Sequence, residues 1–189
     1  VGISISYSNG NGFRPAQTLQ PQILYSALAV GDVNGDGRPD LIAGKAVGAG
    51  ESSVDLFLNR GGGVFDGPQY IASPLVNRIA ATDLNGDHRL DLVLLGGPGN
   101  EILTLLGDGN GGFGAPLHTD FGAQGNVLLI ADFNGDGKPD VAVGDANALQ
   151  SVRVYAGDGA GGLKPFASAT VTGGLTSVAA ADFDRDGRA

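Results

Sequence analysis

The sequence predicts an all-β fold, a β-propeller of four-stranded antiparallel blades, and three observations lead to this prediction. An acidic motif recurs about every 50 residues, and a repeat of that length is typical of solenoids, propellers or arrays. Each period holds four short strand-like segments, the strand number of a propeller blade. Helical periodicity is missing over any useful length, and the chain has 34 glycines in 189 residues. The glycine content excludes a helical repeat, and the repeats of a β-solenoid are usually shorter.

The four segments follow one another in the same order in each period. The first is a continuous run of small apolar residues, such as "LAVGD" or "LLIAD", which predicts a strand buried on both faces near an axis. The second follows the acidic loop, as in "DLVLLG". The third alternates, with Val152 and Val154 pointing one way and Arg153 and Tyr155 the other. A glycine-rich turn then leads into the fourth strand, for example from Gly112 to His118.

These segments divide the chain into three full blades and two part-blades. The blades are expected at 21–72, 73–120 and 121–172, and the part-blades at 1–20 and 173–189. A closed propeller needs about four blades or more. The sequence is therefore interpreted as a fragment of a larger propeller or as a protomer that completes a ring by self-association. The absence of methionine, including at position 1, indicates a processed product or a fragment.

Aromatic residues are few, and those that recur are predicted to be core. Phe13, Phe65 and Phe113 each follow a glycine-rich turn, about one period apart, which favours a place in the blade core. Three tyrosines could line a glycan site, but core or rim packing is the preferred interpretation for each. They are Tyr25, Tyr70 and Tyr155. The sequence names no ligand site on these grounds.

The acidic loop places oxygen-bearing side chains at positions 1, 3, 5 and 9, and position 7 can turn its backbone carbonyl inward. The predicted metal ligands are Asp32, Asn34, Asp36, Arg38 and Asp40 in the first loop, Asp83, Asn85, Asp87, Arg89 and Asp91 in the second, and Asp132, Asn134, Asp136, Lys138 and Asp140 in the third. A truncated fourth loop adds Asp182, Asp184 and Asp186 and ends before position 9. Hard cations such as Ca²⁺ take six to eight oxygen ligands, whereas Mg²⁺ keeps its waters. The loops therefore predict three Ca²⁺ sites, and a fourth that is incomplete.

Two details bear on the metal prediction. Glycine at position 6, as in Gly37 and Gly137, permits the positive φ that a tight curl demands, whereas His88 at this position in the second loop should cost energy. The loop is not an EF-hand, because position 12 carries no acid and the flanks are strands. The alternative is a metal-free turn held by Asx hydrogen bonds. Three carboxylates per loop, repeated in register, favour the metal.

The charge of the chain excludes several partner classes. The formal net charge is −9, from 20 acidic and 11 basic residues, which disfavours nucleic acid and anionic membranes. More than half of the acids lie in the four loops, so the acidity is local. Cysteine is absent, which removes disulfides and thiolate metal sites. No apolar run reaches the length of a membrane span.

The repeats resemble the FG-GAP/VCBS family of calcium-binding β-propeller repeats, the family of integrin α-subunit propellers. "GGFGAP" at Gly111–Pro116 is similar to the motif that names the family, and the D-x-N-x-D-G-x-x-D loops are similar to its calcium loops. "VFDGP" at 64–68 and "LKPFA" at 163–167 keep only part of the naming motif. The resemblance implies calcium between the first two strands of a blade, an extracellular or cell-surface setting, and a role in adhesion or glycan binding.

The expected function is that of a non-enzymatic, calcium-binding module of an extracellular protein that binds a protein or glycan on a rim. Two alternatives stay open: a propeller part of a carbohydrate-active enzyme, and a purely structural repeat segment of a large surface protein. Catalysis has little support, because His88 lies in a metal loop, His118 reads as an exposed strand residue, and no nucleophile motif joins Ser, His and Asp.

Overall fold

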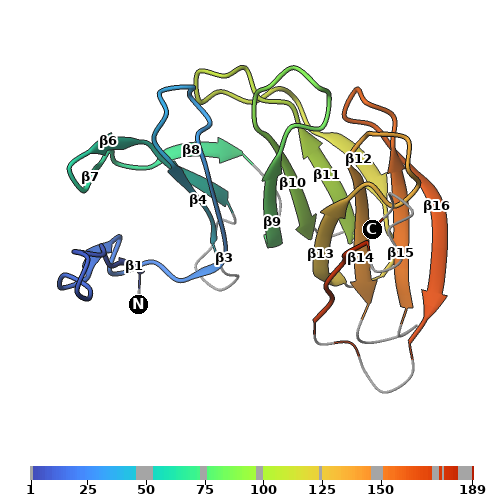
Figure 1. The fold of residues 1–189 in the computed structure, drawn as a ribbon, viewed down its shortest axis with the longest axis horizontal. Coiled ribbons are helices and arrows are strands. Elements are labelled where there is room, and N and C mark those ends of the chain that lie inside the picture. The colour runs from blue at the N-terminus through green and yellow to red at the C-terminus, as the bar shows by residue number, and fades with distance from the viewer. Residues whose placement is uncertain are drawn as a thin grey trace.

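A computed structural model describes residues 2–45, 53–72, 76–96, 100–123, 125–145, 151–171, 175, 177–182 and 189. Within these residues the structure contains strands, turns and bends but no helix, and accordingly no helix that could cross a membrane. Three four-stranded antiparallel sheets stand side by side in an arc that does not close over the described residues (Figure 1). The predicted fold class, an all-β partial propeller, is confirmed.

Each sheet is one blade whose four strands follow one another from the inside of the arc outward. Blade 1 contains β3 (Tyr25–Gly31), β4 (Asp40–Lys45), β5 (Ser53–Phe57) and β8 (Gln69–Ala72). Blade 2 contains β9 (Val76–Thr82), β10 (Asp91–Gly96), β11 (Glu101–Leu105) and β12 (Leu117–Asp120). Blade 3 contains β13 (Gly125–Ala131), β14 (Asp140–Asp145), β15 (Ser151–Gly157) and β16 (Leu163–Thr170).

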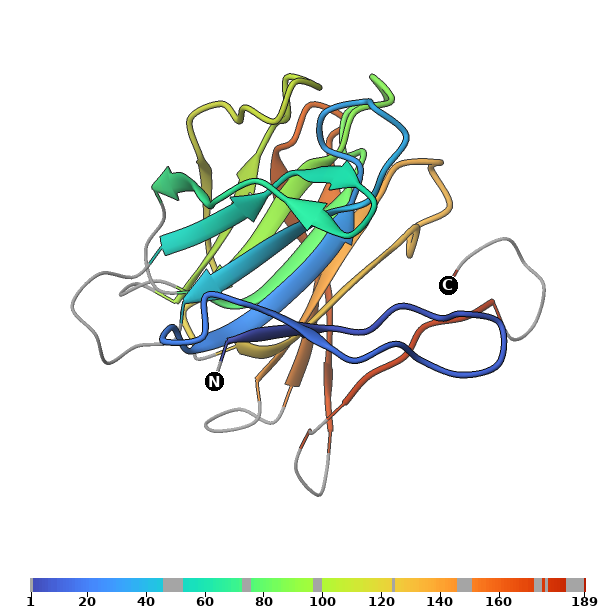
Figure 2. The same cartoon turned by 90° about the vertical axis from the view of Figure 1, so that its left-hand side faces the viewer.

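Two small hairpins complete the described structure. The N-terminal part-blade pairs β1 (Ile3–Ile5) with β2 (Gln17–Leu19), and β6 (Asn59–Gly61) pairs with β7 (Val64–Phe65) in the glycine-rich turn of blade 1. Figure 2, turned by 90°, shows the part-blade as a long hairpin beside the inner strands of blade 1. Its alternation follows the sequence, because Ile3 is buried while Ser4 is exposed.

The hydrophobic core lies in the seams between neighbouring sheets. One cluster joins blade 1 to blade 2, a second joins blade 2 to blade 3, and a third joins the part-blade to blade 1. In blades 2 and 3 the second strand is the most deeply placed, since every residue of β10 and β14 is buried, whereas in blade 1 it is the third strand, β5, that is wholly buried. Burial of each large apolar side chain contributes about 1.5–3 kcal/mol. The seams therefore supply most of the hydrophobic stabilisation of the arc.

The prediction that the first strand is buried on both faces is wrong for blade 1. Leu28 and Val30 of β3 are 52% and 60% exposed, whereas Leu128 and Ile130, four and two residues before the acidic loop of blade 3, pack into the seam with blade 2. The difference is one of neighbours, because the part-blade supplies β1 and β2 but no inner strands to cover β3.

Two further expectations are corrected. Phe113 and Phe65 pack against seam clusters, but Phe13 is 76% exposed. Phe113 and Phe65 each pack toward the preceding sheet, and among the described residues no sheet precedes the part-blade for Phe13 to pack against. The fourth strand of blade 2 is β12, Leu117–Asp120, so it begins later than the predicted start at Gly112. The glycine-rich segment before it forms turns and one isolated bridge, Gly107 to Phe113.

Candidate metal loops

The three complete acidic loops occupy the same place in the three blades. Each connects the first strand to the second, from β3 to β4, from β9 to β10 and from β13 to β14. All three lie along the upper rim of the arc (Figure 1). The repeat in sequence is therefore a repeat in space, with one acidic loop per blade.

Within a loop, the side chains at positions 1, 3 and 5 accept hydrogen bonds from the backbone of the same loop. In the first loop, the Asp32 carboxylate accepts from the N–H groups of Asp36 at 3.1 Å and Gly37 at 2.7 Å. Asn34 Oδ1 also accepts from Asp36 N–H, and Asp36 Oδ1 accepts from Arg38 N–H. The second and third loops repeat this pattern. These are Asx-type turns, the arrangement expected of the metal-free alternative.

The backbone of each loop is left-handed at two positions, 6 and 4, and the sequence predicted only the first of them. At position 6, φ is +79° for Gly37, +81° for Gly137 and +65° for His88. The His88 backbone is thus left-handed, which costs a non-glycine residue about 1–2 kcal/mol, and its side chain is 96% exposed. Position 4 is also left-handed in all three loops. The residues there are Gly35, Gly86 and Gly135.

The aspartate at position 9 has a second role that sequence reasoning missed. Asp91 is fully buried, and its carboxylate accepts N–H bonds from Leu84, in its own loop, and from Gly107, after the third strand, each at 2.8 Å. Asp40 and Asp140 make the corresponding pairs of bonds. The position-9 carboxylate therefore fastens the acidic loop to the end of the third strand in every blade.

The pKa values divide the carboxylates into two groups. Hydrogen bonds, first of all from Gly137 N–H, lower the pKa of Asp132 and keep it ionised. Burial raises the pKa of Asp40, and the nearby charges of Asp36 and Asp32 raise it further despite two backbone donors. Burial likewise raises the pKa of Asp91. A cation beside positions 1, 5 and 9 would offset this mutual repulsion.

The donor set matches a hard cation in chemistry, because it consists only of oxygens. Among the described residues, however, no group of three or more acidic or histidine side chains is placed so that it could hold a metal ion. The position-9 carboxylates are engaged by backbone amides, and the Arg38 guanidinium lies 2.8 Å from Asp36 Oδ2, where it partly neutralises the first loop. Calcium binding thus stays a prediction, and it requires the carboxylates to leave their present hydrogen bonds and converge on one point.

Other predicted residues are placed as follows. Asp182 is exposed, whereas Asp184 and Asp186 lie outside the described residues. His118 is an exposed residue of β12, and its Nδ1 lies 2.7 Å from Glu101 Oε2. Tyr25 packs edge-on against Phe57. Tyr70 is exposed and Tyr155 is buried.

Repeated four-stranded antiparallel sheets with an acidic loop between the first two strands define the chain as a repeat protein of the β-propeller class. Comparison with family models gives the particular family. The model of the FG-GAP-like repeat matches residues 83–143 and 132–189, and that of the FG-GAP repeat matches residues 24–56. The chain belongs to the FG-GAP repeat family. A search of curated proteins found no match.

Proposed function

We propose that the chain is a non-enzymatic, calcium-stabilised β-propeller module of an extracellular or cell-surface protein, which presents its surface to a protein or glycan partner. The observation that carries the proposal is the recurrence of one loop conformation, with carboxylates at positions 1, 5 and 9, on one rim of three blades. Extracellular modules often bind Ca²⁺ with Kd values of about 10⁻⁴–10⁻³ M. Sites of that affinity fill outside cells and stay empty in the cytosol.

Calcium should raise the melting temperature. A ligand at 100 times its Kd stabilises the folded state by about 2.7 kcal/mol per site, and each kcal/mol shifts Tm by roughly 2–4 °C in a chain of this size. With a Kd of about 10⁻⁴ M, Ca²⁺ at about 10 mM reaches that ratio, and three occupied loops should then raise Tm by at least about 10 °C relative to chelator. Differential scanning calorimetry with elemental analysis measures this.

A pair of variants separates site binding from general charge effects. Asp136→Asn removes a position-5 carboxylate and should reduce both the bound calcium and the Tm shift, whereas Asp66→Asn, an exposed acid outside the loops paired with Arg60, should leave both unchanged. Identical melting curves with and without Ca²⁺, together with no metal in the protein, would overturn the proposal.

The two open faces of the arc support a second proposal, that further blades complete a ring, from a longer chain or from a second copy. At one end Leu28 and Val30 are exposed at positions that are covered in blades 2 and 3. At the other end, Leu129 and Phe133 of blade 3 line an apolar cavity of about 240 Å³ against Val178–Ala181. Their equivalents in blade 2, Ala80 and Leu84, pack in a seam.

Sedimentation equilibrium of the 189-residue chain tests self-association. If copies of the chain form a ring, a single discrete oligomer should be present over a wide concentration range. The variant Val30→Asp, which places a charge on the open face, should then be a monomer. A monomer at all concentrations rules out the self-assembling form and favours a structural repeat segment within a larger propeller.

A further inference from the structure

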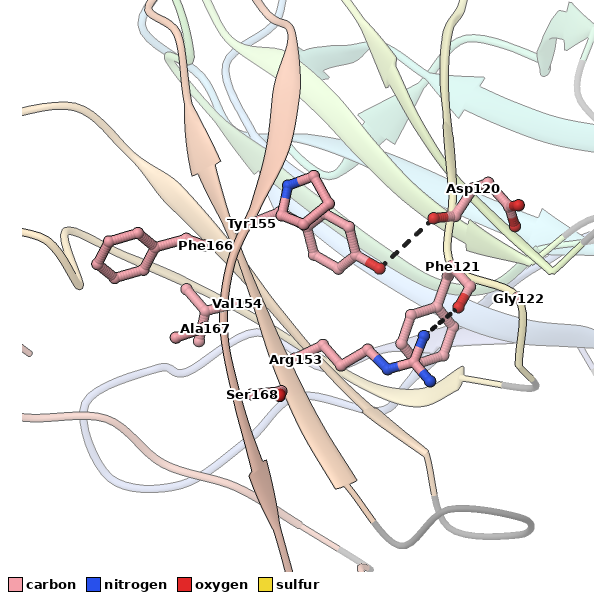
Figure 3. Close-up of a pocket in the computed structure, with 10 residues that line it drawn as sticks. Asp120, Phe121, Gly122, Arg153, Val154, Tyr155, Phe166, Ala167 and Ser168 are labelled. Carbon is pink, nitrogen blue, oxygen red and sulfur yellow. Dashed lines mark hydrogen bonds between the residues drawn. The ribbon is translucent and has the colours of Figure 1, made fainter.

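A groove on the outer side of the arc lies between blades 2 and 3, away from the acidic loops. It has a volume of about 530 Å³ and is walled by Asp120–Gly122, after β12, and by parts of β15 and β16. Its volume falls within the roughly 300–1,000 Å³ typical of small-ligand sites. Arg153 and Tyr155 point from β15 toward the Asp120–Gly122 segment, whereas Phe166 lies on the opposite side of β16 (Figure 3).

The Arg153 guanidinium is the cation of this groove, and its neighbours hold it in place. It donates to the Phe121 carbonyl at 2.7 Å and lies 5.1 Å from the centre of the Phe121 ring. A guanidinium carries five N–H donors in a planar fork, and the Phe121 carbonyl accepts from one of its terminal nitrogens. Among the described residues, no salt bridge involves Arg153.

The same position in the other two blades shows that the fold does not need an arginine here. Arg153 pairs with Val143, Leu103 pairs with Leu94, and Asp55 pairs with Ala43, each three residues after the position-9 aspartate. Leu103 is buried in the seam between blades 1 and 2. A leucine avoids the desolvation cost that a partly buried guanidinium carries. The arginine in blade 3 therefore calls for a reason other than seam packing.

Asp55 shows how the chain treats a charge at this position when the charge is structural. Its carboxylate accepts a hydrogen bond from the Tyr25 hydroxyl at 2.7 Å and lies 3.2 Å from Lys45 Nζ, so it has both a hydrogen-bond donor and a counter-ion. Arg153 has the Phe121 carbonyl, the Phe121 ring and the neighbouring Tyr155 hydroxyl instead, all of them uncharged, and it borders an open groove. The partner that the guanidinium lacks within the described chain is an anion.

The other polar groups of the groove suit a ligand that carries hydroxyls or amides beside its charge. The Tyr155 hydroxyl reaches the Asp120 carbonyl over only a long bond of 3.5 Å, which a ligand could replace. Ser168 stands opposite Arg153 in the register of β15 and β16. The Asp120 carboxylate points away from Tyr155 (Figure 3), so it does not occupy the place of an incoming anion.

We propose that the groove between blades 2 and 3 binds a small carboxylate-bearing ligand, whose carboxylate is held by Arg153 and whose polar groups meet Tyr155 and Ser168. The net charge of −9 disfavours unspecific anion binding. Recognition of the carboxylate must therefore come from the Arg153 guanidinium itself. The inference rests on the binding role proposed above and names a site for it. Calcium binding and the Tm shift do not involve the groove, so the two proposals can fail separately.

Two matched pairs of probes test the site and distinguish a sugar acid from an amino-acid side chain. Galacturonate is compared with galactose, and N-acetylglutamate with N-acetylglutamine, by ¹H–¹⁵N NMR titration of the chain in chelator. At least one acid should bind with a Kd on the order of 1 mM and shift the Arg153 Nε–H and Gly122 signals. Its neutral partner should bind about tenfold more weakly, because it lacks the charge-assisted bonds.

Arg153→Gln should abolish the preference for the acid, Arg153→Lys should keep part of it, and Arg14→Gln, which removes an exposed arginine of the part-blade, should leave it unchanged. If Arg153→Gln does not fold, the proposal is judged from the wild-type titration alone, by whether the signals that the acid shifts belong to residues of the groove. Equal binding of acids and neutral partners, no binding at 20 times the expected Kd, or shifts confined to the acidic loops would each overturn the proposal.

Discussion

Replacing Asp91 by alanine should lower the free energy of unfolding by about 3 kcal/mol, even in chelator. The substitution leaves the N–H groups of Leu84 and Gly107 without their acceptor in a fully buried place, and each unsatisfied buried group costs about 1–3 kcal/mol. Two such groups together cost about 2–6 kcal/mol. The loss of the raised-pKa carboxyl itself is favourable, because burial opposes its charge, and this keeps the net effect in the lower half of that range. Urea unfolding followed by circular dichroism measures it.

The control is Asp87→Ala in the same loop. Asp87 is exposed, and its carboxylate accepts bonds from within the loop, so in chelator the change should cost less than about 1 kcal/mol. With calcium, both variants should lose the stabilisation of this loop. If Asp91→Ala in chelator is as mild as Asp87→Ala, the position-9 aspartate serves the metal alone and its role as a fastener between loop and strand is refuted.

The fold was predictable because every period of the sequence repeats two apolar runs with an acidic loop between them. Continuous apolar runs can bury both faces only between sheets, and the acidic loop between two such runs must turn back at a rim. The structure bears this out in β10 and β14. The exposure of Leu28, Val30 and Phe13 was not predictable from the pattern, because their residues are typical of the repeat and only the neighbouring blade differs.

The residues of the candidate metal loops could be predicted from the sequence, but the backbone N–H groups that donate to the position-9 carboxylates could not. Spacing indicates that Asp40, Asp91 and Asp140 lie close to the rest of their loops, yet it carries no sign of Asn59, Gly107 or Gly157, whose N–H groups these carboxylates accept. Those partners come from the end of the third strand, more than ten residues away in sequence. The groove at Arg153 could not be predicted either, because an alternating strand that contains one arginine indicates only a half-exposed strand.

Gly107→Ala should destabilise the protein by about 3 kcal/mol. A Cβ at this position would lie less than 3.0 Å from the Leu90 carbonyl oxygen, a backbone atom that cannot swing aside, and overpacking of a tight site costs typically 1–3 kcal/mol and occasionally more. Any shift that relieves the overlap would also stretch the bond from Gly107 N–H to Asp91. Gly67→Ala is the matched control, because its Cβ would meet nothing within 4 Å, and its Tm should stay within about 2 °C of the wild type.

Blade 1 shows what this position requires of a side chain. Asn59 stands there, its N–H donates to Asp40, and its amide donates to the Pro39 carbonyl at 3.0 Å. A side chain is thus tolerated only where the turn opens into the β6–β7 hairpin. Because Gly107→Ala and Asp91→Ala weaken the same bond, their effects should not add, and the double variant should be at least about 1 kcal/mol more stable than the sum of the single losses predicts. Strict additivity would mean that the glycine and the aspartate stabilise blade 2 independently. The bond from Gly107 N–H to Asp91 would then contribute nothing to the link between the acidic loop and the third strand.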